Sequence, residues 1–165
     1  MPDLIYNQRD IPPEQWRYGL RSSAATGCGW IATWNALRLL GYTAEIPELI
    51  RYYEKQLPGI HGNLGTMFWG PALCFRQWGF PVALHTRGYD EAAKAAAVSI
   101  LFYHWHRGKK FGAHFIALRF HDGRFVGYNV FRNSTGPDDL GESLEEFIRR
   151  RKYFGHMLLT ILPKT

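Results

Sequence analysis

The sequence predicts an α+β domain in which helices come first along the chain and an antiparallel sheet follows. Helical apolar spacing, ended by Gly or Pro, dominates residues 28–78, and shorter strand-like runs dominate residues 81–162. An Asp-Gly pair at 122–123 separates two of these runs and predicts a hairpin. Because helices and strands are segregated along the chain, we expect the N-terminal helices to pack on one antiparallel sheet.

The N-terminal half begins with a segment predicted to be extended or looped, over residues 4–27, which contains Pro12-Pro13 and many small or polar residues. Apolar spacing then predicts three helices, each with a Gly or Pro at its end. They are expected over about 28–40 before Gly41, from 43 or 45 to 57 before Pro58, and over 66–78 before Gly79, with a turn over 60–65.

The C-terminal half is predicted to supply the sheet. Strands are expected over 81–85, 98–105, 113–121, 124–130 and 156–162. A short helix over 90–95 is expected to start at Asp90 as its cap, and a second helix is expected to run from 143 or 144 to 151. The 165 residues contain no linker or repeat that would divide them, so the chain is predicted to be one domain over 1–165.

The net charge of +6 and the pI of about 9.5 do not by themselves predict nucleic-acid binding, because the basic residues are dispersed. The one dense run, 149–152, ends a predicted helix that begins with Glu145 and Glu146, which is the pattern that complements a helix dipole. No apolar run is long enough to predict a membrane span, and the N-terminus lacks the features of a secretory signal. With two cysteines, the chain is expected to be cytoplasmic.

Two motifs carry the chemistry. Thr26-Gly27-Cys28-Gly29 opens an apolar helix, and Gly112-Ala113-His114-Phe115 opens an apolar strand. A thiol at a helix N-terminus lies in a positive potential that favours the thiolate. An imidazole beside it can form the thiolate–imidazolium pair used in acyl transfer. The glycines that flank Cys28 are interpreted as leaving the sulfur accessible and letting a substrate backbone approach.

Together with Gln8-x-Asp10 and Tyr18-Gly19, these motifs resemble papain-like cysteine peptidases of the bacteriocin-leader-peptidase branch. The resemblance covers the order of elements over most of the chain, whereas its specific motifs are a few short pieces. It implies a papain-like fold with Cys28 as nucleophile and His114 as base. It also implies an Asp or Asn that orients the base, and often a Gln that lines the oxyanion hole.

The orienting residue is expected on the return strand of the hairpin, where Asn129 lies at a suitable distance from His114 and would accept from the imidazole through its amide oxygen. Asn133 is the alternative, and Asp122 lies at the far end of the hairpin. Gln8 is the expected oxyanion donor, with Gln15 as the alternative. This chain departs from the family in having Trp30 after Cys-Gly and Ser22 six residues before the cysteine.

The expected activity is hydrolysis of a peptide or isopeptide bond through a Cys28 thioester, with a peptide or protein as the substrate and neither nucleic acid nor membrane as a partner. An acyltransferase or amidase would use the same chemistry, and a papain-like module that binds peptides without turnover is the alternative from another class. No cofactor is expected. His104 and His106 would share one strand face, but no further ligand follows at a metal-site spacing, so no metal is expected.

Overall fold

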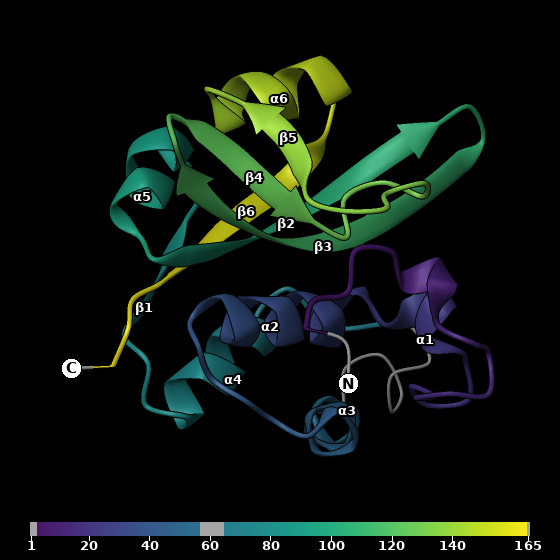
Figure 1. Cartoon of the computed structure of the whole chain (residues 1–165). Coiled ribbons are helices and arrows are strands. Elements are labelled where there is room, and N and C mark those ends of the chain that lie inside the picture. Colours follow the sequence, from purple (N-terminus) through teal and green to yellow (C-terminus); the bar gives the residue numbers. More distant parts are fainter. Residues whose placement is uncertain (1–2, 57–64, 165) are drawn as a thin grey trace.

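The computed structural model describes residues 3–56 and 65–164 and has the predicted α+β class, with helices on both faces of an antiparallel sheet (Figure 1). The sheet has six strands in the order β1-β6-β2-β3-β4-β5. The strands are β1 (Val82–His85), β2 (Val98–Arg107), β3 (Lys110–His121), β4 (Arg124–Tyr128), β5 (Asp138–Gly141) and β6 (Phe154–Ile161). Every neighbouring pair in the sheet is antiparallel.

Four helices lie below the sheet in the view of Figure 1. They are α1 (Ser23–Thr26), α2 (Cys28–Leu39), α3 (Ile46–Lys55) and α4 (Gly70–Gln77). The predicted ends of α2 and α4 are confirmed, since Gly41 and Gly79 have φ of 79° and 78°, which suits glycine at a helix C-terminus. The turn predicted over 60–65 and the stop at Pro58 lie outside the described residues, apart from Gly65.

On the opposite face lie α5 (Tyr89–Ala95) and α6 (Leu144–Arg151). The prediction that Asp90 caps α5 is wrong, because the helix begins one residue earlier and its N-cap is Gly88. The Asp90 carboxylate instead accepts from the backbone N–H groups of Leu144 and Glu145, at 2.7 and 3.1 Å. A residue that looked like a local cap therefore ties the first turn of α6 to α5.

Strand alternation divides the core between the two faces of the sheet. Phe115 and Ala117 of β3 pack with α2 and α4, whereas Ile116 and Leu118 pack with α5 and α6. A third cluster, centred on Trp30 of α2, fills the space between α2 and α3. Residues 29–37 of α2 are therefore all buried, and Cys28 at the start of the helix is half-buried.

Some elements of the fold were not predicted from the sequence. The segment predicted as a loop over 4–27 contains the 3-10 helix η1 (Gln8–Asp10) and α1, and the strand β5 was missed. Helix α4 begins at Gly70, four residues after the predicted start at 66, with a proline in its first turn. These elements are short, so they offer little periodicity to detect.

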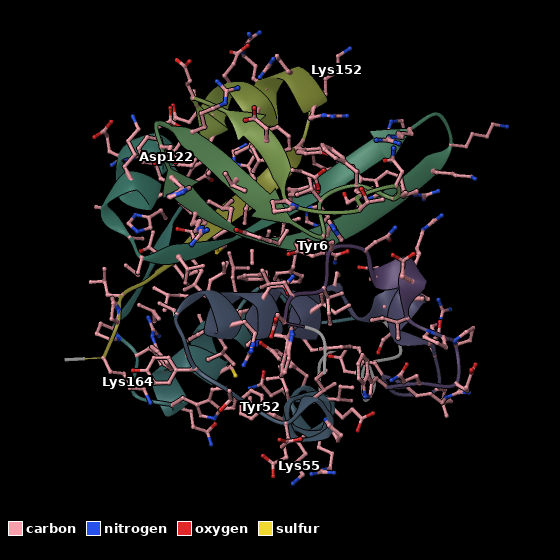
Figure 2. All side chains as sticks on the ribbon, in the orientation of Figure 1. Tyr6, Tyr52, Lys55, Asp122, Lys152 and Lys164 are labelled. Atoms are coloured by element: carbon pink, nitrogen blue, oxygen red, sulfur yellow. The ribbon has the colours of Figure 1, made fainter. Side chains whose placement is uncertain are left out.

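The N-terminal segment joins the two layers. Tyr6 lies between the sheet and the helices below it (Figure 2) and stacks on Tyr128 of β4, with ring centroids 6.2 Å apart. The backbone of Ile5 is held by the side chain of Asn35 from α2, through bonds of 2.8 Å in each direction. The next residues form η1, which lies against α1, where the Gln8 side chain donates to the Ala24 carbonyl. Among the described residues, no helix is both long and apolar enough to cross a membrane.

Candidate active site

Cys28 is the first residue of α2, directly after α1 and Gly27. Its side chain is half-buried and packs against the core cluster that lies between α2 and the sheet. Three backbone N–H groups point at the sulfur: those of Cys28 and Gly29, and that of Phe115 in β3. The Phe115 contact places the sulfur beside the peptide bond that joins Phe115 to His114.

The expectation of a stabilised thiolate is not met in the free protein. Burial raises the pKa of the Cys28 thiol to about 11, because the loss of solvent around the sulfur outweighs the three N–H groups that favour the anion. Burial likewise lowers the pKa of the His114 imidazole, although its bond to Asn129 acts in the other direction. At neutral pH the pair is therefore a neutral thiol and a neutral imidazole.

The glycines around Cys28 serve the packing of the chain itself, contrary to their interpretation as an approach path for substrate. A Cβ at Gly29 would lie 2.3 Å from atoms of the Thr66 side chain, and one at Gly27 would lie 2.6 Å from the Ser23 carbonyl oxygen. Thr66 is held there by a 2.9 Å hydrogen bond with the Tyr18 hydroxyl. The absence of side chains at 27 and 29 thus lets the start of α2 contact α1 and Thr66 closely.

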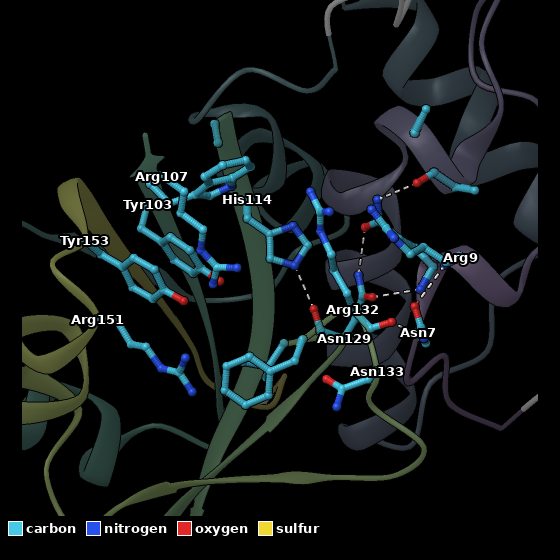
Figure 3. A pocket seen from close by; sticks show the side chains of 17 residues that line it. Asn7, Arg9, Tyr103, Arg107, His114, Asn129, Arg132, Asn133, Arg151 and Tyr153 are labelled. Carbon is cyan, nitrogen blue, oxygen red and sulfur yellow. Dashed lines mark hydrogen bonds between the residues drawn. The ribbon is translucent and has the colours of Figure 1, made fainter. Parts of the chain in front are cut away.

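His114 lies on β3 opposite Tyr103 of β2 and lines a cavity of about 620 Å³. Its Nε2 is 2.7 Å from the backbone carbonyl oxygen of Asn129 (Figure 3). A carbonyl can only accept, so Nε2 carries the hydrogen and, in the neutral ring, Nδ1 carries the lone pair. No hydrogen bond joins the His114 ring to the Cys28 thiol in the part of the chain that the structure describes.

Asn129 does contact His114 as predicted, but through its main chain. The predicted bond from the imidazole to the amide oxygen is wrong, because that oxygen accepts from the backbone N–H of Gln8 at 2.8 Å. The Asn129 Nδ2 donates to Oε1 of Gln8 at 3.1 Å. Asn129 is buried and has a φ of 60°, a left-handed conformation that asparagine tolerates better than most residues. This conformation turns its carbonyl toward His114 while its side chain holds Gln8.

Gln8 lines the same cavity as His114, and its Nε2 also donates to the Ala24 carbonyl at 2.9 Å. That bond uses one of the two Nε2 hydrogens. Gln15, the alternative oxyanion donor, is exposed and does not line the cavity. Asn133 does line it, whereas Asp122 sits at the far end of the β3–β4 hairpin (Figure 2), as the sequence indicated.

No sequence pattern predicts that arginines gather around this cavity. Its lining includes Arg9, Arg107, Arg132 and Arg151, which come from four separate segments (Figure 3). Arg151 belongs to the basic run that was explained as the end of α6, and that explanation is incomplete. Because the four are far apart in sequence, only the fold could bring them together.

No cluster of His, Cys, Asp or Glu in the described residues could hold a metal ion. His104 instead stacks between Phe111 and Phe154, with centroid distances of 5.5 and 5.6 Å. No family model matches the chain, and no curated protein matches it either.

Proposed function

We propose that the protein is a papain-like cysteine hydrolase that cleaves a peptide or isopeptide bond through a thioester on Cys28. His114 takes the thiol proton as the sulfur attacks the carbonyl carbon, and then gives it to the leaving nitrogen. Water, activated by the same imidazole, hydrolyses the thioester and returns the thiol. The proposal depends above all on one observation: the Asn129 carbonyl fixes the hydrogen on Nε2 of His114, which leaves Nδ1 free as the proton acceptor.

The environment of the sulfur supports this assignment. The Phe115 N–H at the thiol is adjacent in the chain to His114. Strand alternation directs the His114 side chain to the face of β3 that carries Tyr103, so the attack requires a rearrangement that brings the sulfur and Nδ1 together. Since burial keeps the thiol protonated, the imidazole must act as a general base during the attack. A lowered pKa suits that role, because it keeps His114 unprotonated at neutral pH.

Gln8 and the start of α2 supply the groups for an oxyanion hole. The backbone N–H of Cys28 lies at a helix N-terminus, and the second Nε2 hydrogen of Gln8 is not used by its bond to Ala24. One such donor typically contributes about 3 kcal/mol to stabilisation of the transition state. The two hydrogen bonds between Gln8 and Asn129 would then couple the oxyanion donor to the residue that orients the base.

A peptide-binding module without turnover is the second candidate. It is favoured by the position of the Cys28 sulfur, since Cys28 is not among the residues that line the cavity beside His114. In such a module the cavity would bind a peptide while the thiol stayed protonated and unused. Replacing Cys28 would then leave peptide binding, its sole activity, unchanged.

A peptide library derived from a proteome tests the proposal, with newly formed termini identified by mass spectrometry. We expect cleavage by the wild type and none by Cys28→Ala or His114→Ala. The matched controls are Cys74→Ala, which removes a buried thiol elsewhere, and His121→Ala, which removes an exposed histidine at the far end of the hairpin. Cleavage that survives in Cys28→Ala would exclude the mechanism. Peptides retained but never cut would favour the binding module.

A further inference from the structure

The cavity beside His114 has an unbalanced positive charge. Arg107 and Arg151 lie on the side of Tyr103 and Tyr153, and Arg132 and Arg9 lie on the other side of the imidazole (Figure 3). No Asp or Glu is among the residues that line the cavity. The potentials of the four guanidinium groups therefore add at the cavity.

These arginines also lack the ion pairs that other arginines of the chain have. Arg38, Arg124, Arg149 and Arg150 each have a carboxylate within 4.0 Å. In the described part of the chain, none of the four cavity arginines forms such a pair. All four side chains are exposed, so each can meet a ligand with its full charge.

Two of the four are held by aromatic rings that leave their charge intact. The guanidinium carbon of Arg151 lies 4.4 Å from the ring centre of Phe131, and that of Arg107 lies 6.0 Å from the ring centre of Trp105. Such contacts orient a guanidinium over a ring face without neutralising it. Behind them, the rings of Tyr103 and Tyr153 stack with centroids 3.9 Å apart and form a rigid wall.

We propose that this cavity selects acyl substrates that carry carboxylates next to the bond to be cleaved, such as a peptide rich in Glu or Asp. The inference rests on the proposed function, which requires a carbonyl beside His114. Guanidinium groups bind carboxylates through paired hydrogen bonds, and arginines on both sides of the imidazole could hold acidic side chains on both sides of the bond.

A peptide fits the site better than a nucleic acid does. The arginines converge on one cavity of about 620 Å³, a size typical of sites for small ligands or short peptide segments. Binding of single-stranded nucleic acid uses a long basic groove that follows the backbone over several nucleotides. The reaction proposed here also needs an acyl carbon, which a nucleic acid does not supply.

Fluorescence anisotropy with the Cys28→Ala protein separates this inference from the proposed function, since binding needs no turnover. The probes are a short fluorescein-labelled glutamate-rich peptide and the same peptide with every Glu replaced by Gln. We expect the acidic peptide to bind about tenfold more tightly than the Gln peptide at low salt, because it forms a few exposed ion pairs of modest strength each. The difference in affinity should shrink as salt is added.

Arg132→Gln and Arg151→Gln should each reduce the preference for the acidic peptide by about two- to fivefold. The control is Arg76→Gln, which makes the same change in net charge at an exposed position of α4 outside the cavity, and it should keep the preference. Equal binding of the two peptides would overturn the inference, as would an equal loss in Arg76→Gln or stronger competition by a single-stranded RNA of matched charge. If the preference is present but the wild type cleaves neither peptide, the carboxylate site stands and the proposed hydrolysis fails.

Discussion

Replacing Asn129 by Gly separates what its side chain does from what its backbone does. The backbone carbonyl accepts from Nε2 of His114, whereas the side chain holds Gln8 through one bond to its backbone N–H and one to its Oε1. Glycine keeps the carbonyl and adopts a φ of 60° without strain. The substitution should therefore weaken the fold and leave the imidazole oriented.

The size of the stability loss follows from the bonds removed. Two hydrogen bonds at about 1 kcal/mol each, plus about 0.5–1 kcal/mol for the added freedom of glycine in the unfolded chain, give a decrease of about 2.5–3 kcal/mol in the free energy of unfolding. Asn133→Gly is the matched control, because Asn133 lines the same cavity but is exposed and forms no hydrogen bond to His114 or Gln8 in the described structure. It should cost no more than about 1 kcal/mol.

Urea denaturation measures the stability loss, and nitrogen-15 NMR of the histidine side chains reports the tautomer. At urea concentrations well below the unfolding midpoint of Asn129→Gly, His114 should still carry its hydrogen on Nε2. Turnover should fall by no more than about tenfold, which corresponds to an increase of about 1.4 kcal/mol in the activation free energy. A shift of the hydrogen to Nδ1, or a loss of turnover as severe as in His114→Ala, would refute this reasoning.

Gly29→Ala should destabilise the fold by about 1–3 kcal/mol in a thermal melt, because the new methyl group would overlap the Thr66 side chain. Adding Thr66→Gly to this variant should recover part of the loss. An unchanged melting temperature in Gly29→Ala would contradict the packing described. Since the pKa of His114 is lowered in the folded state, the free energy of unfolding should fall as pH decreases below about 6.5 and level off below the folded pKa. This pH dependence should vanish in His114→Gln and persist in His121→Gln. Alkylation of Cys28 by iodoacetamide should keep accelerating with pH up to about 11, and a plateau near pH 7 would show that burial does not control the thiol.

The sequence predicted the parts of this fold that depend on periodicity and local punctuation. Helix α2 ends where Gly41 predicts, and the β3–β4 hairpin turns at Asp122-Gly123, because both signals depend on the φ angles that single residues prefer. The strand β5 was missed because its four residues, Asp138–Gly141, include two acidic residues and a single large apolar side chain, and pairing with β4 alone defines it.

The sequence predicted where the residues of the candidate site lie in the fold better than it predicted their contacts. Sequence spacing predicted that Asn129 lies near His114. It did not predict the left-handed backbone that turns the Asn129 carbonyl toward the ring, or the bond of its side chain to Gln8, a residue far away in the chain. The helix N-terminus at Cys28 was predicted as well. Its effect on the thiol was overestimated, because the sequence does not show how deeply the sulfur packs against the sheet.

The positive charge of the cavity could not be predicted from the sequence. Arg9, Arg107, Arg132 and Arg151 are dispersed in the sequence, and a dispersed set of basic residues suggests an ordinary solvated surface. Their convergence depends on the ends of β2 and α6, the loop after β4 and the placement of η1 against the sheet. No local pattern encodes such a meeting of distant segments.

One measurement tests most directly whether Cys28 and His114 act as one catalytic unit: the rate at which a p-nitrophenyl ester acylates Cys28. The release of nitrophenolate reports the rate, and mapping of the acyl group identifies the cysteine that carries it. At neutral pH we predict acylation of Cys28 ahead of Cys74 in the wild type, and a rate at least 100-fold lower in His114→Ala. Equal rates in the two proteins would contradict the account, because a protonated thiol without its base should not attack the ester.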